Sequence, residues 1–595
     1  MSNGDAGTAL DLEELRERYR IEREKRLRPD GNAQYHDLTG KFADFDRDPY
    51  VEPGVTRDPQ VEEVDVVIVG AGFGGMLAGA NLRKLGDTSF RILDKAGDFG
   101  GTWYWNRYPG CMCDVESFVY MPMLEETGYM PTEKYASAPE IFAYCQLLGH
   151  TFDLYSSALF QTEIRDASWD DAAQRWVITT TRDDRLTAKF LVIAGGVLNH
   201  AKLPGIPGIE TFAGHQFHTS RWDYGYTGGG PFERMENLAD KRVGIVGTGA
   251  TAVQVVPRLA ESAKEVYVFQ RTPAAVGVRN QQPTDPEWFT SLEPGWQRAR
   301  IRNFTANVTG TQPDVDLVDD EWTKLWRTDT RKLPASEAEA AELERIDFEK
   351  MDGLRRRIDE IVEDPDTAQK LKPWYGTYCK RPCFHDEYLP SFNEPNVHLV
   401  DTDGKGVELI NERGPVVDGV EYPVDVLVYA SGFEVTTEYS HRLGFDPHGR
   451  TGLSMSEAWS DGAHTLHGVF TRGFPNLLMI STVQGGFGVN FVHYLTETSL
   501  HVATIIDQCL REGIAEIEPT EEAQEEWFML LMTMVDGLAR YNATCTPGYL
   551  NNEQAEGDMK AARNTPFMGS VMDYAAHLER WRADGKMAGV EATRA

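Results

Sequence analysis

A chain of 595 residues is too long to fold around one hydrophobic core, so we expect about two to four domains. Apolar residues make up 41% of the chain, which is enough to form buried cores and excludes a disordered protein. The formal net charge of -34 would repel nucleic-acid phosphates and anionic lipids, and this argues against both as partners.

The first 60 residues are polar and charged, and they predict an N-terminal extension. One amphipathic stretch through Leu12, Leu15 and Tyr19 predicts a helix, followed by an extended tail that packs on the main body. The N-terminus shows no basic-then-apolar signal pattern, and no apolar run reaches the ~18 residues that a membrane span needs. We therefore expect a cytoplasmic protein that does not bind membranes.

A first dinucleotide-binding fingerprint begins where the apolar strand 66–69 ends. In this G-x-G-x-x-G motif Gly70 allows a tight turn, Gly72 lets the backbone approach a pyrophosphate, and Gly75 lets the helix pack on the strand. The helix N-terminus directs N–H donors and a positive dipole end at the phosphates. The next strand ends in Asp94, placed to accept ribose hydroxyls. The expected cofactor contacts are Gly70, Gly72, Phe73, Gly75, Asp94 and Lys95.

A second fingerprint, of the G-x-G-x-x-A kind, follows the strand 243–246. The strand after it ends in Arg271 and Thr272 and carries no carboxylate there. A 2′-phosphate is repelled by an acid and bound by a guanidinium and a hydroxyl, so NADP(H) is favoured over NAD(H), although Arg271 could also be an ordinary surface charge. The expected contacts are Gly247, Thr248, Gly249, Ala250, Thr251, Arg271 and Thr272.

Two adenine-dinucleotide sites together imply FAD and NADPH, with hydride passing from the nicotinamide to the flavin. The alternation of strands and helices predicts an α/β protein with two Rossmann-like domains. Ser336 and Glu339 have capping-box spacing at the head of a charged, helical insertion. The predicted extension covers residues 1–60, and the predicted insertion covers 280–370. The FAD-binding domain is predicted in two parts, 61–205 and 392–595, and the second part includes C-terminal substrate loops. The NADP-binding domain is also predicted in two parts, 206–279 and 371–391.

The seven cysteines give no disulfide framework, and Cys111 and Cys113 are too close for a redox or zinc pair. We therefore expect all seven to be reduced thiols. His464 and His467 are three residues apart, and His385 precedes two acids, but no further ligand set accompanies either group. The sequence thus predicts no metal site.

Four segments resemble the signatures of the Baeyer–Villiger monooxygenases. The first, Phe212-x-Gly214-x-x-x-His218-x-x-x-Trp222, stands just before the second fingerprint, as it does in that family. The others are the segment from Gly100-Gly101-Thr102-Trp103 to Asp114, the run Lys380-Arg381-Pro382, and the domain-linking run Ala430-Ser431-Gly432-Phe433. They occur in order over residues 64–480, and their joint occurrence is far more specific than any one of them.

The resemblance implies that Arg381 is catalytic and that Asp114 orients it. An always-charged guanidinium can stabilise a flavin C4a-peroxide and the adduct it forms with a ketone. A structural salt bridge is the alternative reading of this pair. The resemblance also places Lys380 with Arg271 and Thr272 at the 2′-phosphate. It implies that the enzyme retains NADP+ to protect the peroxide, and that the Trp222 motif has a structural role. Gly101, Thr102 and Trp103 are expected at the flavin.

The implied reaction inserts one oxygen atom from O2 beside a ketone carbonyl and gives an ester or lactone. The alternatives are a flavin monooxygenase that oxidises nitrogen or sulfur, disfavoured by Trp222 and the Lys380–Pro382 run, and a non-catalytic flavoprotein, which would be expected to lack Arg381 or a fingerprint. A disulfide reductase would need a CxxC or CxxxxC pair, which is absent. The N-terminal extension and the loop 545–553 resemble the subgroup that accepts bulky, large-ring or steroidal ketones. We expect a monomer or homodimer.

Overall fold

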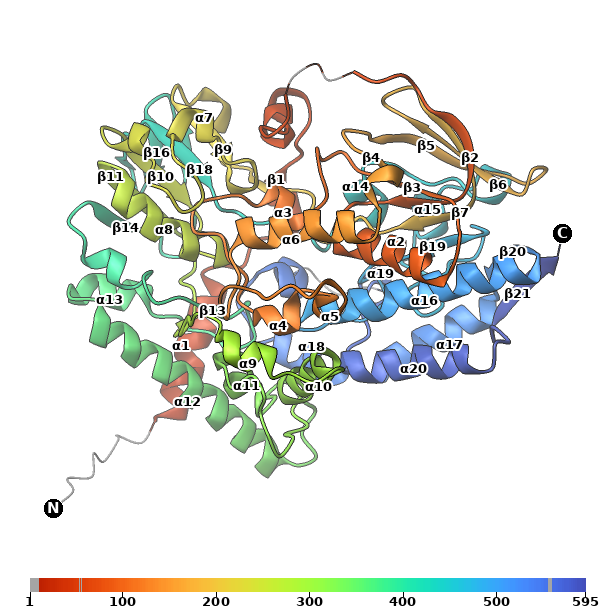
Figure 1. The fold of residues 1–595 in the computed structure, drawn as a ribbon. Coiled ribbons are helices and arrows are strands. Elements are labelled where there is room, and N and C mark those ends of the chain that lie inside the picture. Colours follow the sequence, from red (N-terminus) through yellow and green to blue (C-terminus); the bar gives the residue numbers. More distant parts are fainter. Residues whose placement is uncertain (1–9, 53, 55, 555–558, 595) are drawn as a thin grey trace.

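The computed structural model describes residues 10–52, 54, 56–554 and 559–594, so the first nine residues of the predicted extension lie outside it. Two sheets, each built around parallel strands, lie side by side in the upper half of Figure 1, with the green insertion helices below one and the blue C-terminal helices below the other. This arrangement confirms the predicted α/β fold with two dinucleotide-binding units.

The first sheet has the strand order β4-β3-β2-β7-β6-β5, with β19 paired to β7. Strands β4, β3, β2, β7 and β19 run parallel, and β5 and β6 form an antiparallel extension. Helix α2 (Phe73–Leu85) starts at the first glycine turn and packs against the long C-terminal helix α16 (Phe491–Glu512). The strands are β2 (Val61–Val69), β3 (Phe90–Leu93), β4 (Ala158–Leu159), β5 (Ile164–Asp170), β6 (Arg175–Thr180), β7 (Arg185–Ile193) and β19 (Leu477–Met479).

The second sheet is parallel throughout, in the order β14-β11-β10-β18-β9. Its strands are β9 (His215–His218), β10 (Arg242–Val246), β11 (Glu265–Gln270), β14 (Val397–Asp401) and β18 (Val426–Tyr429), and α8 (Ala250–Ser262) follows its glycine turn. The predicted boundary at residue 392 is therefore wrong, because β14 and β18 belong to the second sheet. Sequence patterns identify these segments as strands but do not show which neighbours they pair with.

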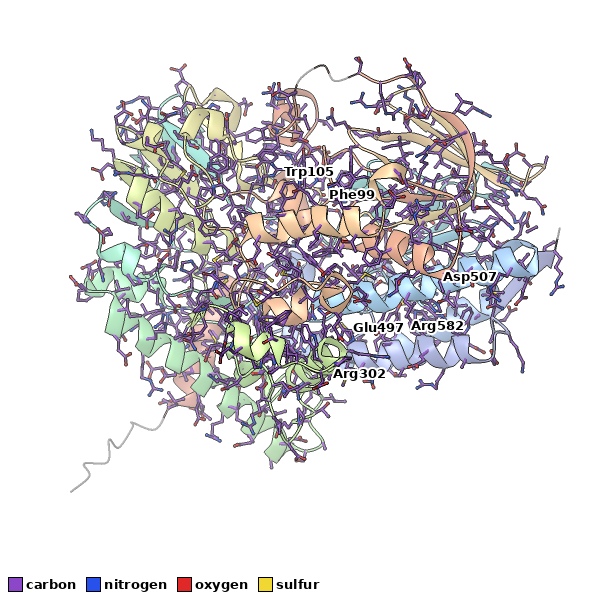
Figure 2. The ribbon with its side chains drawn as sticks, viewed as in Figure 1. Phe99, Trp105, Arg302, Glu497, Asp507 and Arg582 are labelled. Carbon is purple, nitrogen blue, oxygen red and sulfur yellow. A yellow bond between two sulfur atoms is a disulfide. The ribbon has the colours of Figure 1, made fainter. Side chains whose placement is uncertain are left out.

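Residues 280–370 form helices, as predicted. Ser336 caps the longest of them by accepting a hydrogen bond from the Glu339 backbone N–H, and Met351 and Ile358 are buried on its inner face. Where the insertion meets the C-terminal helices, Glu497 lies near Arg302 and Arg582 (Figure 2). Burial raises the pKa of Glu497, although the charges of these two arginines oppose the shift. The insertion helices are α9 (Pro286–Thr290), α10 (Trp296–Val308), α11 (Glu321–Trp326), α12 (Glu337–Ile361) and α13 (Pro365–Leu371).

The N-terminal extension begins with the predicted helix, α1 (Leu12–Glu24), and the Tyr19 ring packs edge-on against Phe348 of α12 at 5.0 Å. The tail that follows is less extended than predicted, because it forms two 3-10 helices, η1 (Gly31–Gln34) and η2 (Gly40–Asp46). A short strand between them, β1 (Tyr35–His36), pairs with β8 (Leu203–Pro204). The extension thereby lies along the second unit and reaches the linker between the two sheets.

The C-terminal part is mostly helical, as expected. It contains α17 (Glu521–Met532), α18 (Asp536–Asn542), α19 (Met559–Arg563), α20 (Val571–Ala583) and the antiparallel pair of β20 (Ile514–Pro519) with β21 (Val590–Arg594). None of the helices in the described part of the chain combines the length and the apolar character that crossing a bilayer requires.

One prediction about the cysteines is wrong. Cys379 and Cys545 form a disulfide although 166 residues separate them in the chain. The other five cysteines are free and buried. Folding places the loop after α18 against the segment that carries Lys380 and Arg381, and sequence spacing gives no sign of this contact.

Candidate active site

A large cavity of about 2040 Å³ runs between the two sheets. Both glycine turns line it, and so do Arg271, Lys380 and Arg381. Ligand pockets for one small molecule have volumes of about 300–1,000 Å³, so this cavity has room for more than one ligand. It also brings together residues from the N-terminal extension and from the loop after α18.

The first glycine turn fits a dinucleotide in the way its motif requires. Gly70 has φ +106°, and a Cβ on it would lie 2.3 Å from the Ala194 carbonyl oxygen. A Cβ on Gly75 would lie 1.8 Å from the Gly70 oxygen, so only glycine lets α2 pack this closely. Gly72 is the N-cap of α2 and has no side chain to bond the first N–H groups, which stay available to phosphate.

Gly101 faces this turn from the other side. It has φ +53°, and a Cβ on it would lie 2.6 Å from the Gly72 Cα. Thr102 and Trp103 begin the short helix α3 (Thr102–Trp105), and the Trp103 indole N–H donates to the Tyr120 hydroxyl at 3.2 Å. All three residues line the cavity, and their place beside the flavin stays a prediction. Trp105, on the same helix (Figure 2), stacks under the Arg221 guanidinium.

Asp94 directly follows β3 and borders the cavity, as the fingerprint predicts. Its carboxylate accepts hydrogen bonds from the backbone N–H groups of Ala71 at 2.6 Å and Ala96 at 2.8 Å. Burial nevertheless raises the Asp94 pKa. Next to it, Lys95 forms an ion pair with Asp46 of the N-terminal extension at 2.9 Å, a partner that the sequence did not suggest.

The second glycine turn repeats this geometry. Gly247 has φ +112°, and a Cβ on it would lie 2.5 Å from the Ala430 oxygen. Gly249 is the N-cap of α8 without a side-chain cap, and a Cβ on it would meet no atom within 4 Å. Ala250 starts the helix, and the Thr248 hydroxyl donates to the Thr272 carbonyl at 2.6 Å. Gly247, Thr248, Gly249, Ala250 and Thr251 all line the cavity.

The predicted phosphate-binding residues come together at one end of this turn. Arg271 donates to the Gln34 side chain at 2.8 Å, and the Thr272 hydroxyl accepts from Arg26 at 3.0 Å. Burial and the nearby Arg271 charge lower the Lys380 pKa to about 7. Its ammonium group donates to the Pro547 carbonyl at 2.7 Å.

Sequence reasoning missed the neighbours of this cationic group. Arg26 and Gln34 come from the N-terminal extension, and Glu553, from the loop after α18, has a buried carboxylate 3.7 Å from Arg271. Lys202 also reaches Glu553, at 3.4 Å. The only sequence signal was the basic character of residues 23–28, which is equally typical of an exposed helix end.

Arg381 and Asp114 form the predicted ion pair. One guanidinium nitrogen of Arg381 lies 2.5 Å from Asp114 Oδ1, and its Nε lies 3.3 Å from Oδ2, so the carboxylate fixes the plane of the guanidinium. Burial alone would lower the Arg381 pKa, but the Asp114 carboxylate outweighs it and raises the pKa above the ordinary value. Arg381 therefore stays charged.

Trp322 of the insertion supports this pair, and the sequence gave no sign of it. Its ring lies 5.0 Å from the Arg381 guanidinium carbon, and its indole N–H donates to the Asp114 carbonyl at 2.7 Å. The Arg381 side chain remains 37% exposed although it lies deep in the protein, because it borders the cavity. A charge held in this way can stabilise negative charge that develops on a bound ligand.

His218 and Trp222 do not line the cavity. The His218 ring bonds Ser220 as a helix cap, and burial lowers its pKa to about 3. Trp222 is fully buried and donates to the Thr227 hydroxyl at 3.2 Å. His218 packs edge-on against Phe433, which does line the cavity. This arrangement agrees with the predicted structural role of the motif.

The histidines weighed as metal ligands have other partners. His464 pairs with Asp461 at 2.9 Å, His467 with His577 at 3.1 Å, and His385 accepts from two backbone N–H groups. Within the described ranges, the residues that do come close enough to hold an ion are His200, Glu434 and His441. The absence of a metal site stays a prediction.

Comparison with known proteins gives consistent relatives over the full length. Residues 67–309 match the family model described as pyridine nucleotide-disulphide oxidoreductase. The chain is 48% identical to neopentalenolactone D synthase from Streptomyces avermitilis (98% of this chain, 99% of the relative) and 46% identical to a Baeyer–Villiger monooxygenase from Streptomyces coelicolor (98% of each).

Solved structures also resemble this chain over most of its length. A polycyclic ketone monooxygenase from Thermothelomyces thermophila superposes with a TM-score of 0.92 at 38% identity, over 98% of this chain and 99% of that one. A complex of OTEMO with FAD and NADP superposes with a TM-score of 0.76 at 27% identity, over 90% of this chain and 100% of that one.

Proposed function

This chain belongs to the Baeyer–Villiger monooxygenases, which use FAD and NADPH to insert oxygen beside a ketone carbonyl, and we propose that Arg381 and Asp114 are its catalytic pair. The observation that carries the proposal is the bidentate contact of Arg381 with Asp114 at the wall of the cavity that both glycine turns also line. The ketone, O2, NADPH and a proton give an ester or lactone, NADP+ and water.

The residues fit both cofactors. The two glycine turns offer uncapped helix N-termini to two pyrophosphates, and a Cβ at Gly70 or Gly247 would collide with the neighbouring strand connection. FAD held there would supply the redox chemistry, taking up hydride from NADPH and activating O2. We assign Asp94 to the FAD ribose, and Arg271, Thr272 and Lys380 to the 2′-phosphate of NADPH.

The role of Arg381 is electrostatic. Its guanidinium directs N–H donors at the negative charge that develops on the ketone oxygen and on the oxygen donor, and its fixed orientation costs no reorganisation during the reaction. Asp114 occupies one edge of the guanidinium, which leaves the other donors for the substrate side. Trp322 excludes water from the face of the ion pair.

We propose bulky, polycyclic ketones as substrates. Relatives include a polycyclic ketone monooxygenase and a ketocytochalasin monooxygenase, and these names support the same size class here. Apolar side chains from the C-terminal region border the cavity near the catalytic segment, namely Met532, Val535, Leu538, Tyr549 and Leu550. We also propose O2 as the co-substrate, a monomer or homodimer, and a cytoplasmic location, and the net charge of -34 argues against nucleic acid and membrane as partners.

The catalytic assignment is tested with Arg381→Ala in the FAD-loaded enzyme. We expect flavin reduction by NADPH to persist, while ester formation falls by roughly 10²- to 10³-fold or more and hydrogen peroxide accumulates instead. Normal ester yield from this variant would show that the arginine is misassigned. A panel of small-ring, macrocyclic and polycyclic ketones, with a sulfide added, tests the substrate class, and a preference for cyclohexanone or for the sulfide would contradict it.

A further inference from the structure

Three side chains that the reaction does not use meet where two linkers cross between the sheets. His200 lies on the linker that leaves β7 for the second unit, and Glu434 lies on the linker that returns from β18. His441 lies on the short helix α14 (Tyr439–Leu443) that follows. One ligand atom from each of the three lies within 4.8 Å of the other two.

The spacing of these atoms suits a tetrahedral metal ion. His441 Nε2 lies 3.1 Å and His200 Nε2 lies 3.6 Å from the two oxygens of Glu434. In a tetrahedral zinc site with bonds of about 2.0–2.1 Å, neighbouring ligand atoms lie about 3.3 Å apart. Only small side-chain movements would therefore bring all three to bonding distance of one ion.

The Glu434 carboxylate is buried without a permanently charged partner in contact. Its side chain is 6% exposed, and its ion-pair partners within 4.0 Å, among the residues that the structure describes, are the two histidines. A buried carboxylate is costly unless a cation or several donors compensate it. Lys202 and Arg442 act on Glu434 only from beyond 4.0 Å, and a divalent ion would compensate its charge in direct contact.

His200 provides a second, independent observation. Its Nε2 is buried and has no hydrogen-bond partner in the described part of the chain, although it faces Glu434. An imidazole nitrogen without a hydrogen-bond partner is available to bind a metal ion.

The surrounding backbone holds the group in place. The Glu434 N–H donates to the His200 carbonyl at 2.8 Å, and Ala201 pairs with Phe433 in an isolated bridge. Asn199 donates to the Arg442 carbonyl at 3.0 Å and so ties α14 to the first linker. His441 is 39% exposed and gives solvent access, and Asp37 of the extension lies 3.9 Å from its Nε2.

Contrary to the prediction of no metal site from the sequence, we propose that His200, Glu434 and His441 form a binding site for a divalent transition metal of the zinc class. Two imidazoles and one carboxylate suit Zn²⁺, whereas Mg²⁺ and Ca²⁺ prefer oxygen ligands. Asp37 or water completes the coordination. The bound ion joins both linkers and α14, so it acts as a clamp on the hinge between the two nucleotide units and takes no part in oxygenation.

The test uses the untagged, FAD-loaded chain after chelator treatment and dialysis. Zinc is titrated by calorimetry, and its content is measured after removal of free metal. We expect one Zn²⁺ per chain, with an affinity that falls in Glu434→Gln and in His441→Ala by more than the roughly 100-fold that loss of an outer-shell partner can cost. Zn²⁺ should also raise the Tm of the wild type and leave that of Glu434→Gln unchanged.

His398→Asn is the matched control, because His398 pairs with Glu265 on the second sheet, away from the proposed site, and is not among the three ligands. This variant should bind Zn²⁺ like the wild type. The proposal is overturned if the wild type retains no zinc, or if both ligand variants bind it as tightly as His398→Asn does. FAD content and ketone oxidation without added metal show that each variant is folded.

Discussion

Lys380 donates a hydrogen bond to the carbonyl of Pro547 at 2.7 Å, so the segment that carries Arg381 also holds the loop after α18. The disulfide joins the same two segments, because Cys379 directly precedes Lys380 and Cys545 stands two residues before Pro547. Tyr549 of this loop borders the cavity and acts electrostatically on Arg381. The cavity wall formed by this loop and the segment of Arg381 are therefore joined at two points.

Removing the disulfide should lower stability. A cross-link between residues 166 positions apart restricts the unfolded chain strongly, and its loss typically costs about 2–4 kcal/mol. We expect Cys545→Ser to lower the free energy of unfolding, measured by denaturant titration under oxidising conditions, by this amount. Cys379→Ser and the double variant should lose the same amount, because all three lack one bond. Additive losses in the double variant would show that the cysteines act separately.

Asp114→Asn keeps the shape of the side chain and removes its charge. We expect ester formation to slow by roughly 10²- to 10³-fold, because Arg381 is no longer held in one orientation, while the rate of flavin reduction by NADPH changes little. Stopped-flow absorbance measures the reduction and product analysis measures the ester. Glu116→Gln is the matched control, since Glu116 makes an equally close, buried pair with Arg300 away from the cavity. Equal effects from both variants would make the Asp114–Arg381 pair merely structural.

Arg271→Ala should reduce the preference for NADPH over NADH. A charge-assisted hydrogen bond contributes about 1.5–3 kcal/mol, so kcat/KM for NADPH should fall by roughly 10- to 150-fold, with little change for NADH. Arg413→Ala, which removes a surface arginine paired with Glu421, should leave both values unchanged. Equal losses for the two coenzymes would refute the assignment to the 2′-phosphate.

The sequence predicted those parts of the site that depend on local backbone geometry. Gly70 and Gly247 both adopt the positive φ that the motif requires, and Arg271 follows its strand as expected. The pairing of Arg381 with Asp114 was predicted only through the family resemblance. Local patterns alone do not show which distant segments meet.

The features that were missed all depend on tertiary contacts. The Cys379–Cys545 bond joins segments far apart in the chain, and Trp322 reaches Asp114 from the insertion. The membership of β14 and β18 in the second sheet depends on strand order, which a single sequence does not encode locally. All strands of the second sheet likewise lie between His200 and Glu434 in the sequence.

The low pKa of Lys380 predicts a pH dependence of coenzyme binding. Burial and the Arg271 charge lower this pKa to about 7, so the free enzyme carries a neutral Lys380 above pH 7 and a charged one below it. The 2′-phosphate favours the charged form, and NADPH binding must therefore take up a proton above pH 7. We expect the Kd of NADPH to rise as the pH increases from 7 to 9, by up to tenfold per pH unit.

Lys380→Arg separates this explanation from a general effect of pH. Its guanidinium stays charged over the same range, so the Kd of NADPH should lose most of its pH dependence. NADH, which lacks the phosphate, should bind the wild type with little change between pH 7 and 9. Calorimetry in buffers of different ionisation enthalpy measures the proton uptake directly. If wild type and Lys380→Arg show the same slope with NADPH, the titrating group is not Lys380.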